Sequence, residues 1–521
     1  MDKNTFLAIL LSTGFLMVWF LFFQPKPVAV HNTAPAASAA PAPLKQAELK
    51  KPAAPVMASS SPANEKEVVV ETENYKAVFT TRGAAIKHWY LKEKKGPLVD
   101  LVLERDSTAF GTFPGSVYSV RQPKPLTVVF THVSPLGWQI TKTYELSEKY
   151  LHDLTVETVK IKSSAVLPVI DIPFGPGIGT DEKELKENTS LTRPLGFSLG
   201  NPPKLDKFKP GDYPLKLYKW AALDNRYFLA ALIPYEDSGF DNISVSMLTK
   251  KHPATVSLMS GEPADGAKSQ TQKLMFYLGP KGLEHLKALH MDLEQTVDFG
   301  FFGFLGKLAM WVLNYFYNLT GNYGWAIIIL TVLLQIIVLP LTMKSFQASA
   351  AMKQLQPLVK NLQVKYKADP KRLNVEMLNL YKVHKVNPLG GCLPMLLQLP
   401  IFWALFTTLR NAFELRGAEW IFWVRDLSAP DTLMMVAGIP LNILPLIMGI
   451  GMFFQQQMMS VSTDPAQKQL MYLMPVIFTF MFWGFPSGLV IYWLTNSILT
   501  MAEQYVIMKK QPALVDTSLV K

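Results

Sequence analysis

Two polar side chains interrupt an apolar run in this chain, and their spacing gives them a common direction. Thr331 and Gln335 are four positions apart within residues 325–341, so on a helix they share one face. A polar group in a bilayer is costly unless it finds a partner or water. Two interpretations stay open: such groups bond neighbouring helices as structural contacts, or they line a hydrated cavity. Gln335, near mid-membrane, is the best candidate for the lining.

Further polar side chains lie in the other apolar runs. They are Gln398, Thr407, Thr408, Asn442, Gln455 to Gln457 and Asn496. Met and aromatic side chains in 448–454 and 481–483 would give adaptable apolar walls, although packing is their commoner role. No nucleophile–base pair or phosphate loop stands out in these runs. Any function must therefore come from the shape and hydration of a helical bundle.

The cysteine and histidine content gives no support for a disulfide or a metal site. Cys392 is the single cysteine, which excludes an intramolecular disulfide and a multi-cysteine metal site. Its place in an apolar run predicts a small packed residue. The eight histidines are scattered, and none forms an HExxH motif. We therefore predict no cofactor, no bound metal and no catalytic residue.

Two glycine motifs match known patterns by spacing alone. Gly196, Ser198 and Gly200 fit the G-x-S-x-G elbow, which needs a helix after the serine. The Asn-Pro-Pro run at 201–203 follows at once, and proline there prevents a helix interior. Residues 175–179 resemble a glycine loop, but no helix pattern or Lys-Ser/Thr pair completes it. We interpret the first as a chance match and the second as a tight loop, with an envelope hydrolase using Ser198 kept as an alternative.

The elements that would position the polar side chains are membrane spans. Hydrophobic residues are 49% of the 521 residues, and most of the excess follows residue 300. Residues 344–386 carry nine Lys or Arg against two acidic residues, a net +7 out of +11 for the chain. Short loops rich in Lys and Arg stay on the cytoplasmic side, so this loop sets the orientation. Topology therefore explains the basic charge better than nucleic-acid binding, although contact with ribosomal RNA stays open.

The N-terminal residues predict a membrane anchor and a linker. Residues 1–24 hold an apolar run that is longer than the core of a usual signal peptide and ends without small residues. We favour an uncleaved anchor with its N-terminus inside, and the Ala-rich tract 36–40 keeps cleavage open as the alternative. Residues 25–64 are rich in Pro, Ala and Ser, which predicts an extended linker.

Residues 65–297 predict a large all-β sandwich domain. Apolar and polar residues alternate there and turn residues separate the runs, which is typical of half-buried antiparallel strands. The candidate strands lie in 67–80, 126–132, 138–144, 154–161, 254–259 and 273–278. A helical pattern first appears at 282–293. Because the anchor crosses the membrane once, this domain is expected on the outer side.

The remaining chain predicts an amphipathic helix and five core spans. Residues 298–322 are aromatic and apolar but broken by glycines, which suits a helix lying on the outer leaflet. The core spans are 323–343, 389–410, 432–458, 470–485 and 488–507. The connecting segments are 344–388 and 459–469 inside and 411–431 outside, and the tail is 508–521. The fold class is thus a membrane α-helical bundle, a five-helix core plus the anchor, with a large outer all-β sandwich domain.

The basic segment 344–388 predicts a helical hairpin on the cytoplasmic side. Apolar positions 355, 358, 359, 362 and 366 line one helix face. Asp369 and Pro370 are then expected as the N-cap and first position of a second helix. The basic side chains assigned to meet substrate or ribosome are Lys353, Lys360, Lys365, Lys367, Lys371 and Arg372. The alternative is a solvated charged loop.

Three long motifs resemble the YidC-type membrane protein insertases, the bacterial branch of a family with mitochondrial and chloroplast relatives. They are VNPLGGCLPMLLQLPIF at 386–402, LMPVIF at 473–478 and FPSGLVIY at 485–492. The resemblance covers the whole chain in layout. It implies a five-helix core with a hydrophilic groove open to the cytoplasm and the lipid, a cytoplasmic helical hairpin and a periplasmic β domain.

The resemblance also implies activity, partners and location. Family members insert and fold small proteins of the bacterial inner membrane, alone or beside the Sec translocon, and catalyse no covalent reaction. The expected partners are nascent membrane proteins, the ribosome, the Sec translocon and the lipid bilayer, with the signal recognition particle receptor as a further candidate. Both termini are expected in the cytoplasm.

Carried over residue by residue, the resemblance predicts the groove. Its expected lining or gate is Thr331, Gln335, Gln398, Tyr492 and Trp493. The family usually has an arginine five residues before the proline that ends this span, and that position here is Gln335. A fixed positive charge that attracts an acidic substrate tail is thus in doubt, while a hydrated groove without charge would still lower the crossing penalty. Trp493 stands where relatives often have tyrosine. A transporter or channel is the competing hypothesis.

Overall fold

The structure is a computed structural model that describes most of the chain. The described residues are 65–92, 98–102, 109–180, 192–247, 254–367, 369–384, 386, 393–459 and 465–510. The expected anchor 1–24, the linker 25–64, Cys392 and residues 511–521 of the expected tail lie outside them.

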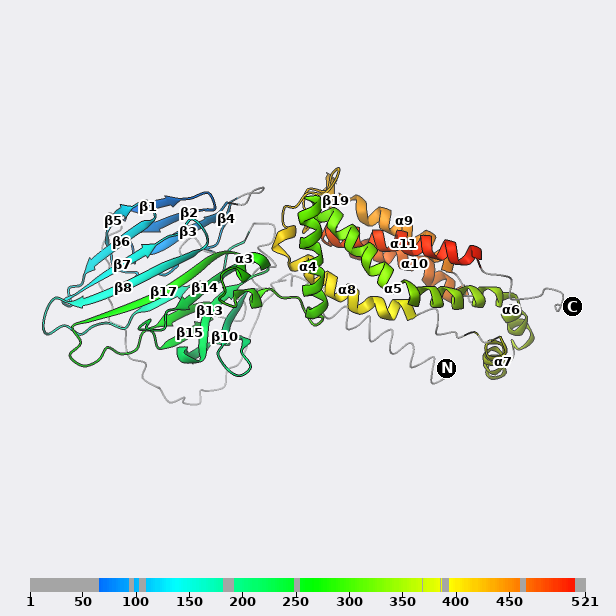
Figure 1. Ribbon diagram of the computed structural model, residues 1–521, viewed down its shortest axis with the longest axis horizontal. Coiled ribbons are helices and arrows are strands. Elements are labelled where there is room, and N and C mark those ends of the chain that lie inside the picture. Colours follow the sequence, from blue (N-terminus) through cyan, green and yellow to red (C-terminus); the bar gives the residue numbers. More distant parts are fainter. Residues whose placement is uncertain are drawn as a thin grey trace, which may run out of the picture. The chain divides into compact units, whose positions relative to one another are not determined.

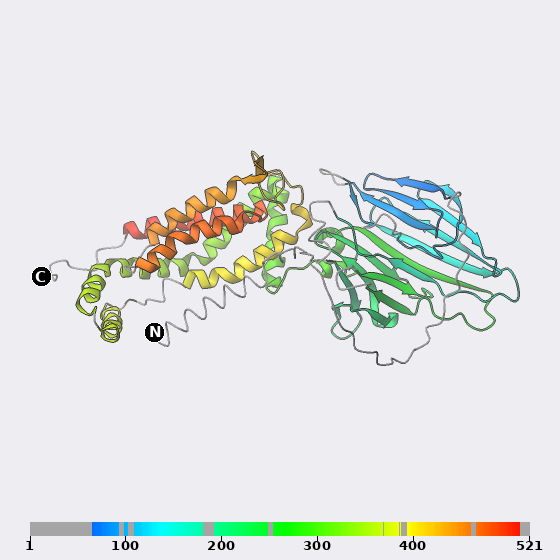
Figure 2. The same ribbon diagram turned by 180° about the vertical axis from the view of Figure 1, so that it is seen from behind.

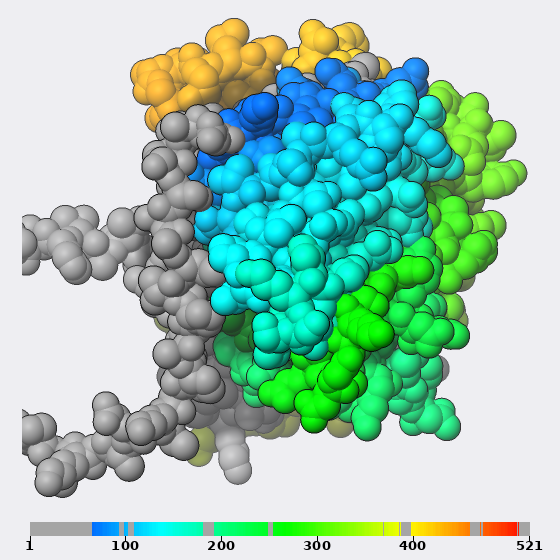
Figure 3. Space-filling model, turned by 90° about the vertical axis from the view of Figure 1, so that its left-hand side faces the viewer, coloured from blue at the N-terminus to red at the C-terminus, as the bar shows by residue number. Residues whose placement is uncertain are grey.

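Three sheets build the β domain. One sheet has the order β1-β2-β3-β4, the second β11-β10-β13-β14-β17-β8-β7-β6-β5 and the third β12-β15-β16-β9. The bounds are β1 Glu67–Glu71, β2 Tyr75–Thr80, β3 Ala85–Leu91, β4 Val99–Asp100, β5 Ser119–Lys124, β6 Thr127–Val133, β7 Trp138–Glu145, β8 Leu151–Lys160, β9 Asp171–Phe174, β10 Arg193–Ser198, β11 Lys204–Lys207, β12 Gly211–Pro214, β13 Tyr218–Asp224, β14 Phe228–Pro234, β15 Asn242–Ser246, β16 Thr255–Met259 and β17 Ser269–Pro280. Figure 1 shows the strands as layers, and Figure 3 shows the face that the blue and cyan N-terminal strands cover.

The alternation along β7 shows how the sequence builds the core of this domain. Trp138 and Tyr144 point inward and are almost fully buried. The intervening residues that point to the other face, such as Gln139 and Thr143, are half-buried. Lys142 occupies an inward position of the same strand and is 0% exposed. Its Nζ donates to the Phe110 carbonyl oxygen and, over 2.8 Å, to Thr112 Oγ1. Burial lowers the pKa of Lys142 well below its ordinary value.

Most of the expected strands are confirmed, with two local differences. The stretches near 126, 138, 154, 254 and 273 correspond to β6, β7, β8, β16 and β17. The run 67–80 is two strands, because Thr72 Oγ1 accepts hydrogen bonds from the Asn74 and Tyr75 amides and closes a turn. The helical pattern at 282–293 forms only the short α3, Leu283–Lys287, followed by the 3-10 turn Leu293–Thr296.

A helical region follows the β domain. Its helices are α4 Gly303–Thr320, α5 Tyr323–Gln354, α6 Gln356–Lys365, α7 Pro370–Val383, α8 Leu393–Asn411, α9 Ile443–Met459, α10 Pro465–Phe482 and α11 Ser487–Lys510. α11 packs on α5, α8 and α9, and α4 packs on α5 and α8. Both ribbon views show α8, α9, α10 and α11 running side by side, with α4 crossing near their ends (Figures 1 and 2).

Local capping explains where two of these helices begin. Asn322 Oδ1 accepts hydrogen bonds from the amides of Gly324 (2.8 Å) and Trp325 (3.4 Å) at the start of α5. Asp369 Oδ1 accepts from the Arg372 amide over 3.1 Å, and Pro370 is the first residue of α7. The N-cap expected at Asp369 is therefore confirmed.

The expected span 432–458 is wrong in its first part. Residues 432–442 form a β-hairpin of β18, Thr432–Val436, and β19, Ile439–Asn442, and α9 begins only at Ile443. Ala437 and Gly438 both have positive φ, 50° and 81°, which makes the two-residue turn of a hairpin. Hydrophobicity alone does not separate an apolar hairpin from an apolar helix, and the turn at Ala437-Gly438 was the missed signal.

Apolar surface is concentrated on the helical region. Among the described helices, α5 is long and apolar enough to cross a membrane, and α9 and α10 contain shorter apolar stretches, Ile443–Met458 and Tyr472–Phe482. α4 buries Met310 and Leu313 on one side and leaves Phe304 80% and Trp311 64% exposed on the other. Large exposed apolar patches of this kind mark contact with lipid or with another protein.

Candidate functional site

The buried face of α5 carries the two polar residues that the sequence singles out. Thr331 is 1% and Gln335 7% exposed. Thr331 Oγ1 donates to the Ile327 carbonyl oxygen of its own helix over 2.7 Å, so its hydroxyl is satisfied locally. Thr342, two turns beyond Gln335, is also buried. α5 therefore presents a polar stripe to the helices that pack against it.

A carboxylate on α11 meets this stripe. Gln335 Nε2 donates to Glu503 Oε2 over 3.0 Å, and Thr342 Oγ1 lies 3.4 Å from the same oxygen. Thr342 Oγ1 also bonds the Leu339 carbonyl oxygen over 3.0 Å, so its bond to the carboxylate is the weaker one. Glu503 itself is half-buried. The three side chains tie the middle of α5 to the second half of α11.

A second polar contact joins α8 and α11. Gln398 Nε2 donates to the Tyr492 hydroxyl, and Tyr492 is 1% exposed. Trp493 belongs to an aromatic cluster, with ring centroids 5.3 Å from Phe402 on α8 and 5.3 Å from Phe482 on α10. Its edge-to-face contact with Phe402, at 89°, is the geometry that aromatic pairs prefer.

Four of the five expected groove residues, Gln335, Gln398, Tyr492 and Trp493, thus enter two separate hydrogen bonds and an aromatic cluster. Within the described ranges, Thr331 bonds only inside its own helix. No hydrogen bond joins the Gln335 contact to the Gln398 contact among the described residues. Sequence reasoning missed Glu503, although a signal was present: Glu503 is the one acidic residue in the five expected core spans. An ionisable residue in such a span is a functional candidate by default.

The basic side chains expected on the hairpin are exposed. Lys353 lies in the last turn of α5, and Lys367 lies between α6 and α7. Lys360 and Lys365 lie on α6, and Lys371 and Arg372 lie on α7. Lys365 Nζ and the Arg372 guanidinium both lie over the Tyr366 ring, 5.5 and 5.4 Å from its centroid. These cations are available to an anionic partner.

The two glycine motifs lie at the end of a strand and in a tight loop. Ser198 is the last residue of β10, and strand β11 rather than a helix follows at Lys204. Gly177 and Gly179 donate backbone hydrogen bonds to Ala254 and Leu101, which fixes a tight loop. No group of three or more His, Cys, Asp or Glu is placed to hold a metal ion within the described ranges.

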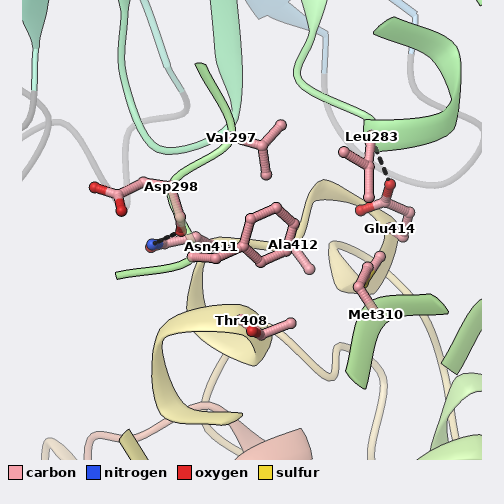
Figure 4. A pocket seen from close by; sticks show the side chains of 9 residues that line it. Leu283, Val297, Asp298, Met310, Thr408, Asn411, Ala412 and Glu414 are labelled. Carbon is pink, nitrogen blue, oxygen red and sulfur yellow. Dashed lines mark hydrogen bonds between the residues drawn. The ribbon is translucent and has the colours of Figure 1, made fainter. Parts of the chain in front are cut away.

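A small cavity of ≈ 10 Å³, room for about one water molecule, lies where the segment before α4 meets the end of α8 (Figure 4). Its lining is Leu283, Val297, Asp298, Phe299, Met310, Thr408, Asn411, Ala412 and Glu414. Figure 4 shows the Glu414 carboxylate turned to the start of α3, where it accepts a hydrogen bond from the Leu283 amide over 2.8 Å. Burial raises the pKa of Glu414 above its ordinary value.

Replacing Glu414 with glutamine is expected to remove part of the pH dependence of stability. A carboxyl with a raised folded-state pKa contributes stability that is complete below the unfolded value, about 4.3, and is lost as pH rises toward the folded value. Glutamine keeps an acceptor for the Leu283 amide but cannot ionise. Glu414→Gln should therefore match or exceed the wild-type melting temperature at pH 7.5, and lose that advantage at pH 4.

Glu157→Gln is the control, because Glu157 is an exposed carboxylate on β8 and is not among the groups that raise the pKa of Glu414. Its melting temperature should follow that of the wild type at both pH values. A Glu414→Gln protein that melts several degrees below the wild type at both pH 7.5 and pH 4 would contradict a raised pKa of Glu414 in the folded protein.

Two family models cover most of the chain between them. The model described as the 60Kd inner membrane protein matches residues 315–513, and the model described as the YidC periplasmic domain matches residues 99–312. Together they take in the helical region and most of the β domain.

Curated relatives match along the full length. A membrane protein insertase YidC of Endomicrobium trichonymphae is 52% identical over 517 residues, 98% of this chain and 98% of its own. The protein of that name from Pelobacter propionicus is 36% identical, over 98% of this chain and 99% of its own. Among solved structures, an active YidC insertase with its first transmembrane domain resolved is 20% identical at a TM-score of 0.40, covering 85% of this chain and 93% of that one.

Proposed function

The chain belongs to the family of the membrane protein insertase YidC, and from that premise we propose that it inserts and folds newly made membrane proteins. The observation that supports this proposal most is the 52% identity, over 98% of the chain, to a curated insertase. Binding and release of an apolar helix need shape, hydration and lipid access. The proposed activity is therefore that of an insertase and chaperone without covalent catalysis.

We place the protein in the bacterial inner membrane, with the β domain in the periplasm. α5, α8, α9, α10 and α11 would be its five core spans, and α6 and α7 would form the hairpin in the cytoplasm. The exposed Lys and Arg side chains of the hairpin support this orientation, since such residues stay on the cytoplasmic side. The exposed aromatic face of α4 would rest in the outer leaflet.

The substrate groove is proposed to run along α5, α8 and α11. Thr331, Gln335, Gln398 and Tyr492 supply polar groups along this path, and Trp493 supplies an aromatic wall. Water beside Gln335 and Glu503 would lower the cost of moving a polar substrate segment part of the way across. The apolar span of the substrate would then leave sideways into lipid.

The partners follow from this activity. Nascent membrane proteins would be the substrates, delivered by ribosomes to the exposed cations of the hairpin. The Sec translocon, the signal recognition particle receptor and the lipid bilayer complete the proposed set. Ribosomal RNA is an anionic surface, and Lys and Arg side chains are the groups that bind such surfaces.

Reconstitution tests the proposed function directly. The purified protein is placed in liposomes, a small single-span substrate is supplied by cell-free translation, and insertion is scored by protection from protease. Protection above that of empty liposomes would support insertase activity without other components. No protection by folded, correctly oriented protein, together with solute flux that Gln335 substitutions alter, would favour a transporter instead.

Reversing the charge of the hairpin is expected to impair delivery. Lys365, Lys367 and Lys371 are exposed, so changing all three to glutamate alters charge without opening a core. Insertion of the same substrate should fall by about threefold or more, since attraction to an anionic partner becomes repulsion. The matched control changes the same lysines to arginine, which keeps the charge. Normal insertion and topology in the glutamate variant would remove the hairpin from the mechanism.

A further inference from the structure

Glu503 is a carboxylate that makes no ion pair within the described part of the chain. Oε2 receives the two side-chain contacts from α5, Gln335 Nε2 at 3.0 Å and Thr342 Oγ1 at 3.4 Å. No Lys, Arg or His among the described residues forms an ion pair with Glu503. The next basic residues along α5 and α11, Lys344 and Lys509, are exposed. Burying a carboxylate without a counter-charge inside a helical bundle costs free energy. An ionisable residue in such a place is therefore a candidate for a functional role.

Its position along the helix is informative. α11 spans Ser487–Lys510, so Glu503 lies seven residues, about 10 Å, from the end of the helix that the proposed topology places in the cytoplasm. Gln335 and Thr342 hold the Oε2 side of the carboxylate in place. A carboxylate accepts about four hydrogen bonds, so it keeps capacity for a further donor. The carboxylate is also half-buried rather than sealed, which leaves it reachable.

We propose that Glu503 binds a lysine or arginine that flanks the cytoplasmic end of a substrate span. This inference rests on the proposed insertase function and names the feature of the substrate that the site would recognise. The amide of Gln335 and the hydroxyl of Thr342 act as positioning groups, because both contact Oε2, which leaves Oε1 able to accept from a cation. A charge-assisted contact of this kind is stronger than one between neutral groups.

The proposed contact gives the groove a preference for substrate orientation. A basic flank held about two turns inside the cytoplasmic end stays on the cytoplasmic side while the apolar span moves into lipid. An acidic flank at the same place meets a like charge and is disfavoured. A neutral flank gains nothing from the site. The Glu503 carboxylate would therefore make insertion most efficient for substrates with a basic flank, less efficient for a neutral flank and least efficient for an acidic flank.

The test compares three single-span substrates that differ only in two flanking residues: two lysines, two glutamines or two glutamates. Each is translated cell-free into liposomes that hold the purified full-length protein, and protease protection gives amount and orientation. The wild type should insert the lysine substrate about five- to tenfold better than the glutamate substrate. Glu503→Gln is close to isosteric and keeps an acceptor for Gln335, and it should reduce that ratio to about twofold or less.

Two further variants separate charge from structure. Glu503→Lys should invert the ranking, so that the glutamate substrate inserts best, which a merely misfolded protein would not do. Glu157→Gln removes the same charge from an exposed position of β8 and should keep the wild-type ranking. Empty liposomes carrying the same lipids give the baseline that the positive-inside tendency sets by itself.

The failure of this inference and the failure of the proposed function look different. Wild-type protein that protects none of the three substrates overturns the insertase proposal. Wild-type protein that protects all three but ranks them as Glu503→Gln does leaves the insertase proposal intact and overturns the role of Glu503.

Discussion

Replacing Gln335 with leucine is expected to reduce substrate insertion by about tenfold while leaving the fold intact. The substitution removes the 3.0 Å hydrogen bond to Glu503 and leaves the carboxylate with the longer Thr342 contact. Hydrogen bonds to charged groups contribute about 1.5–3 kcal/mol, and about 1.4 kcal/mol corresponds to a factor of ten. Leucine also dries the path along α5. The measurement is the initial rate of protease protection in proteoliposomes.

Ile336→Leu is the matched control for this prediction. Ile336 is the next residue of α5, is 59% exposed and is apolar before and after the change. Its insertion rate should equal that of the wild type. If Gln335→Leu inserts substrate normally and instead lowers the melting temperature, Gln335 is an interhelical structural contact, the simpler of the two interpretations that the sequence leaves open.

Periodicity in the sequence was enough to predict the β domain and the face of α5. β7 alternates as expected, and Thr331 and Gln335 share the buried face that their four-residue spacing predicts. These predictions succeed because strand pleating and helical pitch are local properties. The N-cap at Asp369 succeeds for the same reason, since a cap depends on neighbouring residues.

Features that depend on distant segments were not predicted. Lys142 alternates into the core, and nothing in the neighbouring sequence indicates that the Phe110 carbonyl oxygen accepts a hydrogen bond from its ammonium group. Glu503 and Gln335 are 168 positions apart, so their hydrogen bond follows from helix packing and not from either local sequence. The sequence analysis considered Gln335 on α5 without its hydrogen-bond partner on α11.

A buried ion network in the β domain carries the largest expected effect on stability. Asp224 is 0% exposed at the end of β13 and faces Arg193 of β10 in register. The Arg193 guanidinium donates to both of its oxygens, over 3.0 and 2.6 Å, and Lys281 Nζ lies 2.7 Å from Oδ2. Burial lowers the pKa of Lys281, against the opposing attraction of Asp224.

Asp224→Asn is expected to lower the free energy of unfolding by about 3–5 kcal/mol, because it leaves Lys281 buried without its counter-charge. For a domain of this size that corresponds to a fall of roughly 6–20 °C in melting temperature. The measurement is thermal unfolding of the full-length protein in detergent, followed by tryptophan fluorescence. The buried Trp89, Trp138 and Trp220 place reporters in the β domain.

The cause of this fall in stability is tested by also removing the positive charge of Lys281. Asp224→Asn combined with Lys281→Met should be more stable than Asp224→Asn alone by at least about 1 kcal/mol, since the second change deletes the cation that the first leaves uncompensated. Lys219→Met serves as the surface control: Lys219 and Asp292 form an ion pair of 2.7 Å whose side chains are 34% and 41% exposed, and breaking it should change stability by about 1 kcal/mol or less. A double variant that loses the sum of the two single losses would show that packing around Asp224, and not its charge, holds this corner of the β domain together.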